Sequence, residues 1–303
     1  MPVSRINMRT LEYLFGPDRA LFLPAVSAAV AVAILCGPLS VFVVLRRLAF
    51  VGHGVSHAAF GGIGLAAMLG LIVPGAAASA GYFAVVGAFC LGAAALIAAA
   101  GANRRGVSRV GEWREDTLVG VTLVASLAMG ALLLHVRARS GPIGTSVESS
   151  LFGSIFAVRG ADAVAAWIVG IGAGMVLVAA RRPLVFWAFD EPAADAFGVS
   201  CARMRMLLMV LLGVAVIVAM KLAGVLLATA LLVLPGAAAV RLSNRLGAVF
   251  VLSVAVALLG VLGGLVLSFE ADLPPGPCIV MVLVGLLIVS VAVGIGARSR
   301  EVG

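Results

Sequence analysis

The chain has 303 residues, of which 63% are hydrophobic and 11% are charged. Ordinary globular domains hold roughly 45–50% apolar and about 25% charged residues, so this composition excludes a soluble globular protein. The formal net charge of +8 does not indicate nucleic-acid binding, because the arginines stand in pairs at the ends of apolar runs and not on a basic face interleaved with aromatic residues.

Apolar runs long enough to cross a hydrocarbon layer of about 30 Å recur along the chain. We therefore expect an all-α, polytopic membrane helix bundle with about eight or nine transmembrane helices in a single domain over residues 1–303. The expected helices cover about 20–45, 55–73, 78–101, 117–136, 162–181, 206–220, 223–240, 246–268 and 275–297. Only Lys221 and Leu222 separate the sixth helix from the seventh.

Two stretches outside these helices are predicted to contact the membrane without crossing it. Residues 1–19 contain basic and acidic residues and can form an interfacial segment, and the apolar run after them is too long for a cleaved signal. The apolar piece 151–156 is too short to span the membrane, and we expect it to be re-entrant. Counting basic residues in the loops favours a cytoplasmic C-terminus, because loops facing the cytoplasm are enriched in arginine and lysine.

Spacing excludes two enzymatic readings. The only lysine, Lys221, lies between Met220 and Leu222, so the chain has no Gly-Lys-Ser/Thr phosphate loop. A zinc protease helix needs His-Glu-x-x-His, and Gly54 stands where its glutamate would be. The four cysteines are scattered singly, which is typical of small core residues and not of a metal cluster.

The strongest candidate site is the pair His53 and His57, within a stretch that ends in Gly61, Gly62 and Gly64. Residues four apart share one face of a helix, so both imidazoles can face one metal ion. The alternative is structural, with two polar side chains hydrogen-bonded inside a helix bundle. Polar groups inside a membrane are costly and more often functional, which favours an ion site. We interpret His135, beside Arg137, as an interfacial residue.

Glu115 and Asp116 begin the fourth expected helix. Carboxylates at a helix N-terminus complement the macrodipole and cap free amide groups, which is a sufficient structural explanation. They can also supply further oxygen ligands to the ion or form an exit site.

The segment Phe189–Val199 combines acidic residues, alanines and a glycine between arginine pairs. This pattern predicts a short amphipathic helix across a loop. The loop is either a solvated connection or a docking helix for a soluble partner.

Together these stretches resemble the membrane-spanning permease of bacterial ATP-binding-cassette (ABC) importers for zinc, manganese or iron(II), the metal ABC-3 permeases. The resemblance covers about residues 20–297. Its blocks are Arg46–Phe50 with Ser56–Ala58, Glu115–Thr117, Leu151–Gly153, Phe189–Val199, and Gly224–Leu227 through Leu234–Gly236 followed by Asp272–Gly276.

The resemblance implies a transport subunit that is not itself an enzyme, embedded in the lipid of a bacterial inner membrane. Its expected partners are a second copy of itself, cytoplasmic ABC ATPase subunits and an extracytoplasmic metal-binding protein. The resemblance implies no permanently bound cofactor, because the metal ion is the cargo. It also makes residues 182–205 the cytoplasmic loop that couples to the ATPase, through Asp190, Glu191, Ala194, Asp195 and Gly198.

By the same resemblance His57 is the histidine of the translocation path, with His53, Asp116 and Glu115 as further candidate metal ligands. Similar permeases usually carry an acidic residue four positions before that histidine, where this chain has His53. An imidazole in place of a carboxylate suits zinc better than manganese. Two alternatives remain from the sequence alone, namely a secondary cation transporter without an ATPase and an ABC permease for a metal chelate.

Overall fold

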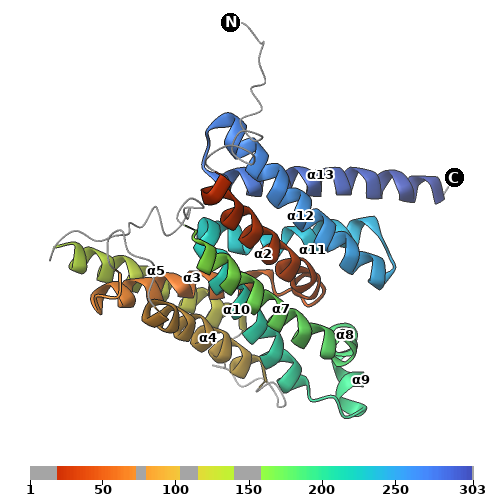
Figure 1. The fold of residues 1–303 in the computed structure, drawn as a ribbon. Coiled ribbons are helices and arrows are strands. Elements are labelled where there is room, and N and C mark those ends of the chain that lie inside the picture. The colour runs from red at the N-terminus through yellow and green to blue at the C-terminus, as the bar shows by residue number, and fades with distance from the viewer. Residues whose placement is uncertain (1–18, 73–79, 103–114, 140–157, 302–303) are drawn as a thin grey trace, which may run out of the picture.

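The computed structural model describes residues 19–72, 80–102, 115–139 and 158–301. Within these ranges the regular structure is entirely helical, as expected from the composition (Figure 1). The helices are α2 (Arg19–Leu45), α3 (Ala49–Met68), α4 (Ala80–Ala102), α5 (Glu115–Ala138), α7 (Gly160–Ala179), α8 (Arg181–Phe189), α9 (Glu191–Ala196), α10 (Cys201–Leu231), α11 (Leu234–Leu242), α12 (Leu246–Ala271) and α13 (Pro275–Glu301).

Seven of the described helices are long and apolar enough to cross a membrane, namely α2, α4, α5, α7, α10, α12 and α13. α3 has 20 residues but is less apolar, because it carries two histidines and several glycines. With α3, the described helices of spanning length number eight, which confirms the expected polytopic bundle.

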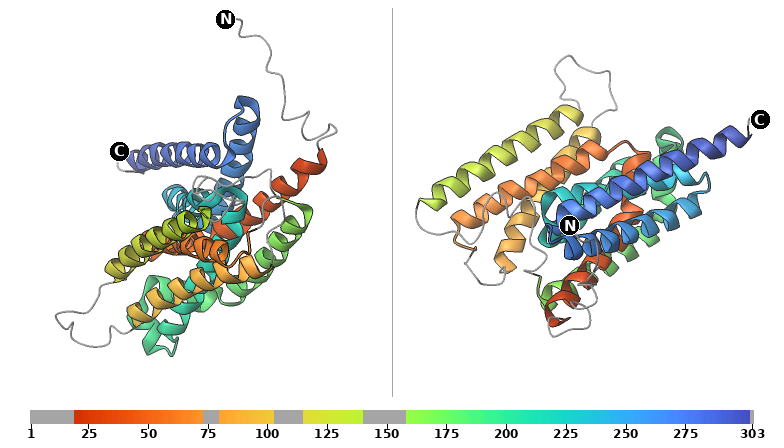
Figure 2. Two further views of the ribbon diagram at one scale, coloured as in Figure 1. Left: turned by 90° about the vertical axis from the view of Figure 1, so that its left-hand side faces the viewer. Right: turned by 90° about the horizontal axis from the view of Figure 1, so that it is seen from above.

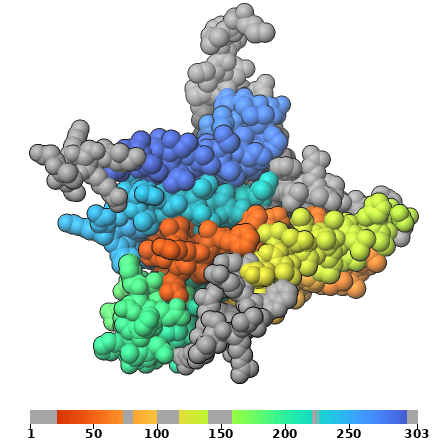
Figure 3. Space-filling view, turned by 180° about the vertical axis from the view of Figure 1, so that it is seen from behind, coloured from red at the N-terminus to blue at the C-terminus, as the bar shows by residue number. Residues whose placement is uncertain are grey.

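α3 is the most enclosed of these helices. It packs chiefly against α5, α4 and α10, and most of its side chains are buried. α2 and α10 form the middle of the bundle, with α3–α5 on one side and α11–α13 on the other (Figures 1 and 2). In the space-filling view the green segment that contains α8 and α9 protrudes from the bundle (Figure 3). The two histidines of α3 are thus surrounded by neighbouring helices.

Close helix contacts explain why α3 contains so many glycines. A Cβ atom at Gly54 would lie 2.7 Å from Cγ1 of Val119, and one at Gly64 would lie 2.8 Å from the Cα atom of Gly130. Small residues let helix backbones approach one another in a membrane. The contacts also show that α3 and α5 run in the same direction, because residue 54 lies beside 119 and residue 64 beside 130.

The prediction of a helix break at Lys221 and Leu222 is wrong. α10 continues from Cys201 to Leu231, with a local distortion at Gly224, whose φ is +76°. The break comes instead after Leu232, where Pro235 lies in the first turn of α11. Proline has no amide hydrogen to donate and is accommodated at the start of a helix, so it decides the boundary here.

The expected start of the second helix at residue 55 is also wrong. α3 begins at Ala49 and therefore contains both His53 and His57. Gly52 and Gly54 lie inside the helix, where Gly54 allows contact with α5 and does not mark a helix start. Residues 1–18 and the expected re-entrant piece 151–156 lie outside the described residues.

Candidate functional site

His53 and His57 lie on one face of α3, as the four-residue spacing predicts. Their ring centroids are 4.4 Å apart and the ring planes are inclined by 71°. His57 is buried with 9% of its surface exposed, and His53 is half-buried. Two imidazoles therefore meet inside the bundle, close enough to share one ion.

The Nδ1 atom of His57 is buried and has no hydrogen-bond partner. Leaving a buried polar atom unpaired costs about 1–3 kcal/mol, so such atoms are uncommon unless they serve a function. This observation argues against the structural alternative, in which the histidines would be hydrogen-bonded to their neighbours. A neutral imidazole nitrogen is also a common metal ligand.

The start of α5 lies at the same level of the bundle as the histidines. Gly54 contacts Val119, and Asp116 precedes Val119 by three residues, which is about one helical turn. The backbone of Glu115 and Asp116 forms the first turn of α5, while their side chains lie outside what the structure describes. No group of three or more His, Cys, Asp or Glu side chains that could hold a metal occurs among the described residues. His135 is exposed in the last turn of α5, far along the helix from this level.

The segment after α7 folds as two short helices, α8 and α9. Asp190 caps α9, and one of its carboxylate oxygens accepts a hydrogen bond from the amide of Ala193 at 2.9 Å. Ala194 is fully buried, whereas Asp195 is exposed. Gly198 ends the segment with a φ of +84°, a conformation that favours glycine. The segment therefore has an anchored face and an exposed face.

Glu191 of α9 joins three separate parts of the chain. Its carboxylate forms an ion pair with Arg46, in the turn between α2 and α3, and a second one with Arg205 of α10, at 3.3 Å. The Arg46 guanidinium also lies over the ring of Trp187, 4.1 Å from its centroid, and Nη1 donates a hydrogen bond to the Trp187 carbonyl at 3.4 Å. α3 begins three residues after Arg46, so this cluster connects α9 to the histidine-bearing helix.

The electrostatics of the cluster follow from its two arginines. Burial alone would raise the pKa of Glu191, but the hydrogen bond and charge of Arg46, together with the charge of Arg205, outweigh burial and hold that pKa below its usual value. Sequence reasoning missed the roles of Arg46, Trp187 and Arg205, because Arg46 lies 145 positions and Arg205 lies 14 positions from Glu191. The only hint in the sequence was that arginine pairs flank the segment Phe189–Val199.

Comparison with known proteins assigns the chain to a family. The family model of the ABC 3 transport family matches residues 18–294. The chain belongs to this family. It is a transport subunit and not an enzyme, and the ATPase of such a system is a separate chain. The family membership favours the predicted ABC permease over a secondary transporter that works without an ATPase.

Curated relatives of this ABC 3 chain are metal transport proteins. It is 31% identical to the manganese transport system membrane protein MntC of Halalkalibacterium halodurans, over 85% of this chain and 82% of that protein. It is 27% identical to the high-affinity zinc uptake system membrane protein ZnuB of Haemophilus influenzae, over 88% of this chain and 95% of that one. Among solved structures, PsaBC from Streptococcus pneumoniae in complex with Fab matches with a TM-score of 0.77 and 26% identity, covering 94% of this chain and 95% of that chain.

Proposed function

We propose that this chain is the membrane-spanning subunit of an ABC importer for a divalent transition metal ion in a bacterial inner membrane. The observation that carries the proposal is the pair His53 and His57, with the Nδ1 atom of His57 buried and unpaired. The working complex contains two copies of this chain, cytoplasmic ATPase subunits and an extracytoplasmic metal-binding protein. The C-terminus and the α8–α9 segment face the cytoplasm, as the distribution of arginines favours.

His57 and His53 are the proposed metal ligands, with Asp116 and Glu115 as oxygen ligands from the neighbouring helix. The register of α3 and α5 supports this set, because Gly54, next to His53 in the chain, packs against Val119, one turn after Asp116. We expect the two imidazoles and these oxygen ligands to hold the ion only moderately, which suits transport because a tightly held ion would not leave. Zinc is the favoured ion, since imidazole replaces a hard oxygen ligand at His53. The relatives named above include both a manganese and a zinc system.

The proposed mechanism is alternating access driven by the ATPases. Asp190, Glu191, Ala194, Asp195 and Gly198 form the proposed coupling element, which moves when the ATPases close on ATP. The cluster of Arg46 and Glu191 passes this motion to the start of α3, and the histidines then release the ion inward. The mechanism is supported by the ion pair between Glu191 of α9 and Arg46, which lies three residues before α3.

The decisive experiment is uptake of radioactive or fluorescently detected zinc by the reconstituted complex carrying His57→Ala. We expect uptake to fall at least about tenfold, because one of only two histidine ligands is lost, while the complex still assembles with its ATPase. His135→Ala is the matched control, since His135 is exposed at the far end of α5. Unchanged uptake in the assembled His57→Ala complex would remove His57 from the translocation path.

A further inference from the structure

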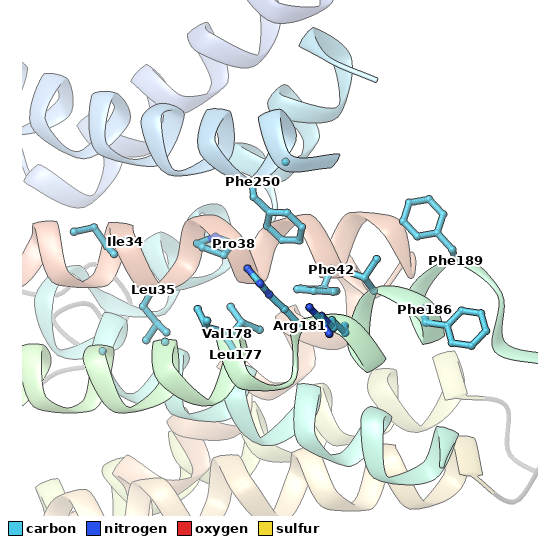
Figure 4. Close-up of a pocket in the computed structure, with 15 residues that line it drawn as sticks. Ile34, Leu35, Pro38, Phe42, Leu177, Val178, Arg181, Phe186, Phe189 and Phe250 are labelled. Atoms are coloured by element: carbon cyan, nitrogen blue, oxygen red, sulfur yellow. The ribbon is translucent and has the colours of Figure 1, made fainter. Parts of the chain in front are cut away.

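A cavity of about 970 Å³ lies between α2, α7, α8 and the start of α12 (Figure 4). Its size is at the upper end of the range of about 300–1,000 Å³ found for ligand sites. Apart from two arginines, its walls are apolar, and they include Pro38, Phe42, Leu177 and Phe250. Such walls accept a hydrocarbon chain.

The depth of the cavity matches one leaflet of a membrane. Its wall runs along α7 from Gly170 toward the end of the helix at Ala179. Nine residues of helix rise about 14 Å, which is about half of a hydrocarbon layer ~30 Å thick. α2 and α7 are both long and apolar enough to cross a membrane. With α7 in a bilayer, a cavity along its last nine residues would reach from the edge of the hydrocarbon layer toward its middle.

The wall of the cavity carries two positive charges. Arg181 and Arg182 both line it, just after the end of α7, and no acidic residue lines it. In Figure 4 the Arg181 side chain extends between α2 and α7 toward Phe250. Neither arginine has an ion pair or hydrogen bond within the described part of the chain. The charges therefore remain available to an anionic group.

We propose that this cavity binds one anionic phospholipid, with an acyl chain between α2 and α7 and the phosphate at Arg181 and Arg182. Basic pockets between transmembrane helices suit anionic head groups, because each arginine near the surface adds favourable electrostatic energy. A free phosphate would use the arginines but leave the long apolar wall uncovered. The occupant that satisfies both parts is an amphiphile with a negative head group. This inference is independent of which ion the protein transports.

The first test removes the charges. The complex of the full chain with its ATPase is recovered from nanodiscs that contain either phosphatidylglycerol or phosphatidylcholine. The lipid molecules that remain bound to it are then counted by native mass spectrometry. Phosphatidylglycerol should be retained preferentially, and the double variant R181Q/R182Q should bind it about thirtyfold more weakly, at about fivefold per arginine. The matched control R203Q/R241Q removes two exposed arginines that do not line the cavity and should retain the lipid. Equal loss in both double variants, or equal retention of the two lipids, overturns the proposal.

The second test fills the apolar part. A Cβ atom at Gly174, which lines the cavity, meets nothing within 4 Å, and the same is true of Gly172, which does not line it. Gly174→Leu should therefore fold and weaken lipid retention at least about fourfold, as expected for displacing one or more methylene groups. Gly172→Leu should leave lipid retention unchanged. If inorganic phosphate alone binds as tightly as the lipid, the occupant is a free anion and the proposal is overturned. If R181Q/R182Q changes the oligomeric state without losing lipid, the occupant is a second copy of the chain and the proposal is likewise overturned.

Discussion

Arg46 lies over the ring of Trp187, with its guanidinium carbon 4.1 Å from the ring centroid. The same guanidinium pairs with Glu191, so one side chain connects the turn before α3 to both α8 and α9. Cation–π contacts of this kind contribute about 0.5–2 kcal/mol, and arginine suits them because its flat guanidinium can stack and donate hydrogen bonds together. This contact links the proposed coupling element to the turn that precedes the histidine-bearing helix.

Arg46→Lys should uncouple ATP hydrolysis from transport. Lysine keeps the charge but loses the stacking on Trp187 and the paired hydrogen bonds that the guanidinium donates to the Glu191 carboxylate and the Trp187 carbonyl. Because the Glu191 side chain is 35% exposed, we expect the altered ion pair to change stability by only about 1 kcal/mol or less. Zinc uptake per ATP hydrolysed should fall several-fold in proteoliposomes. Arg203→Lys, on an exposed arginine at the start of α10, is the control, and equal ratios in both variants would contradict the proposed link.

The Glu191 cluster should make stability depend on acid pH. The pKa of Glu191 is lower in the folded protein than its ordinary value of 4.5. The cluster therefore contributes its full stability above the ordinary pKa, and this contribution is lost as the pH falls through the lowered folded value. Thermal unfolding midpoints measured from pH 7 to pH 3 should fall more steeply for the natural chain than for Glu191→Gln. Parallel curves for the two proteins would show that Glu191 does not contribute.

Gly198→Ala should weaken the proposed docking segment. Gly198 has a φ of +84°, and a residue with a Cβ atom pays about 1–2 kcal/mol in the left-handed region. Gly198→Asn should be milder, because asparagine tolerates this region. Affinity for the ATPase, measured by titrating the detergent-purified chain, should decrease in the order glycine, asparagine, alanine. If alanine and glycine bind alike, Gly198 has no role in docking.

Gly130→Ala should loosen the contact between α3 and α5. A Cβ atom at Gly130 would lie 2.5 Å from the carbonyl oxygen of Phe60, a backbone atom that cannot move aside cheaply. Overpacking of this kind costs about 1–3 kcal/mol, more than the gain in helix propensity of about 1 kcal/mol. Gly120→Ala is the control, because a Cβ there meets nothing within 4 Å, and it should be neutral or stabilising. The unfolding midpoint should fall for Gly130→Ala alone.

His53→Asp should shift metal preference from zinc toward manganese. A carboxylate is a harder ligand than imidazole and suits manganese, whereas imidazole suits zinc. His53→Asn removes the imidazole without adding a charge and should lower uptake of both ions. The measurement is competitive uptake of the two ions by the reconstituted complex. An unchanged ratio in His53→Asp would show that His53 does not select the ion.

The sequence by itself determined the fold class, most of the spans and the pairing of the histidines. Apolar runs of about 20 residues match the length of a membrane-spanning helix, in which every backbone hydrogen bond is made within the segment. A spacing of four residues places His53 and His57 on one face wherever the helix begins, so even the wrong start at residue 55 left that prediction intact.

Only the tertiary structure decided how distant parts meet. Local patterns could not show that α10 continues through Lys221, because the packing of α10 against α4, α3 and α2 involves segments far apart in the sequence. They also could not show that Arg46 meets Glu191, 145 residues away. Contacts between remote segments depend on helix packing and register, which no local periodicity encodes. For the same reason the cavity beside Arg181 became visible only when α2, α7 and α12 were placed together.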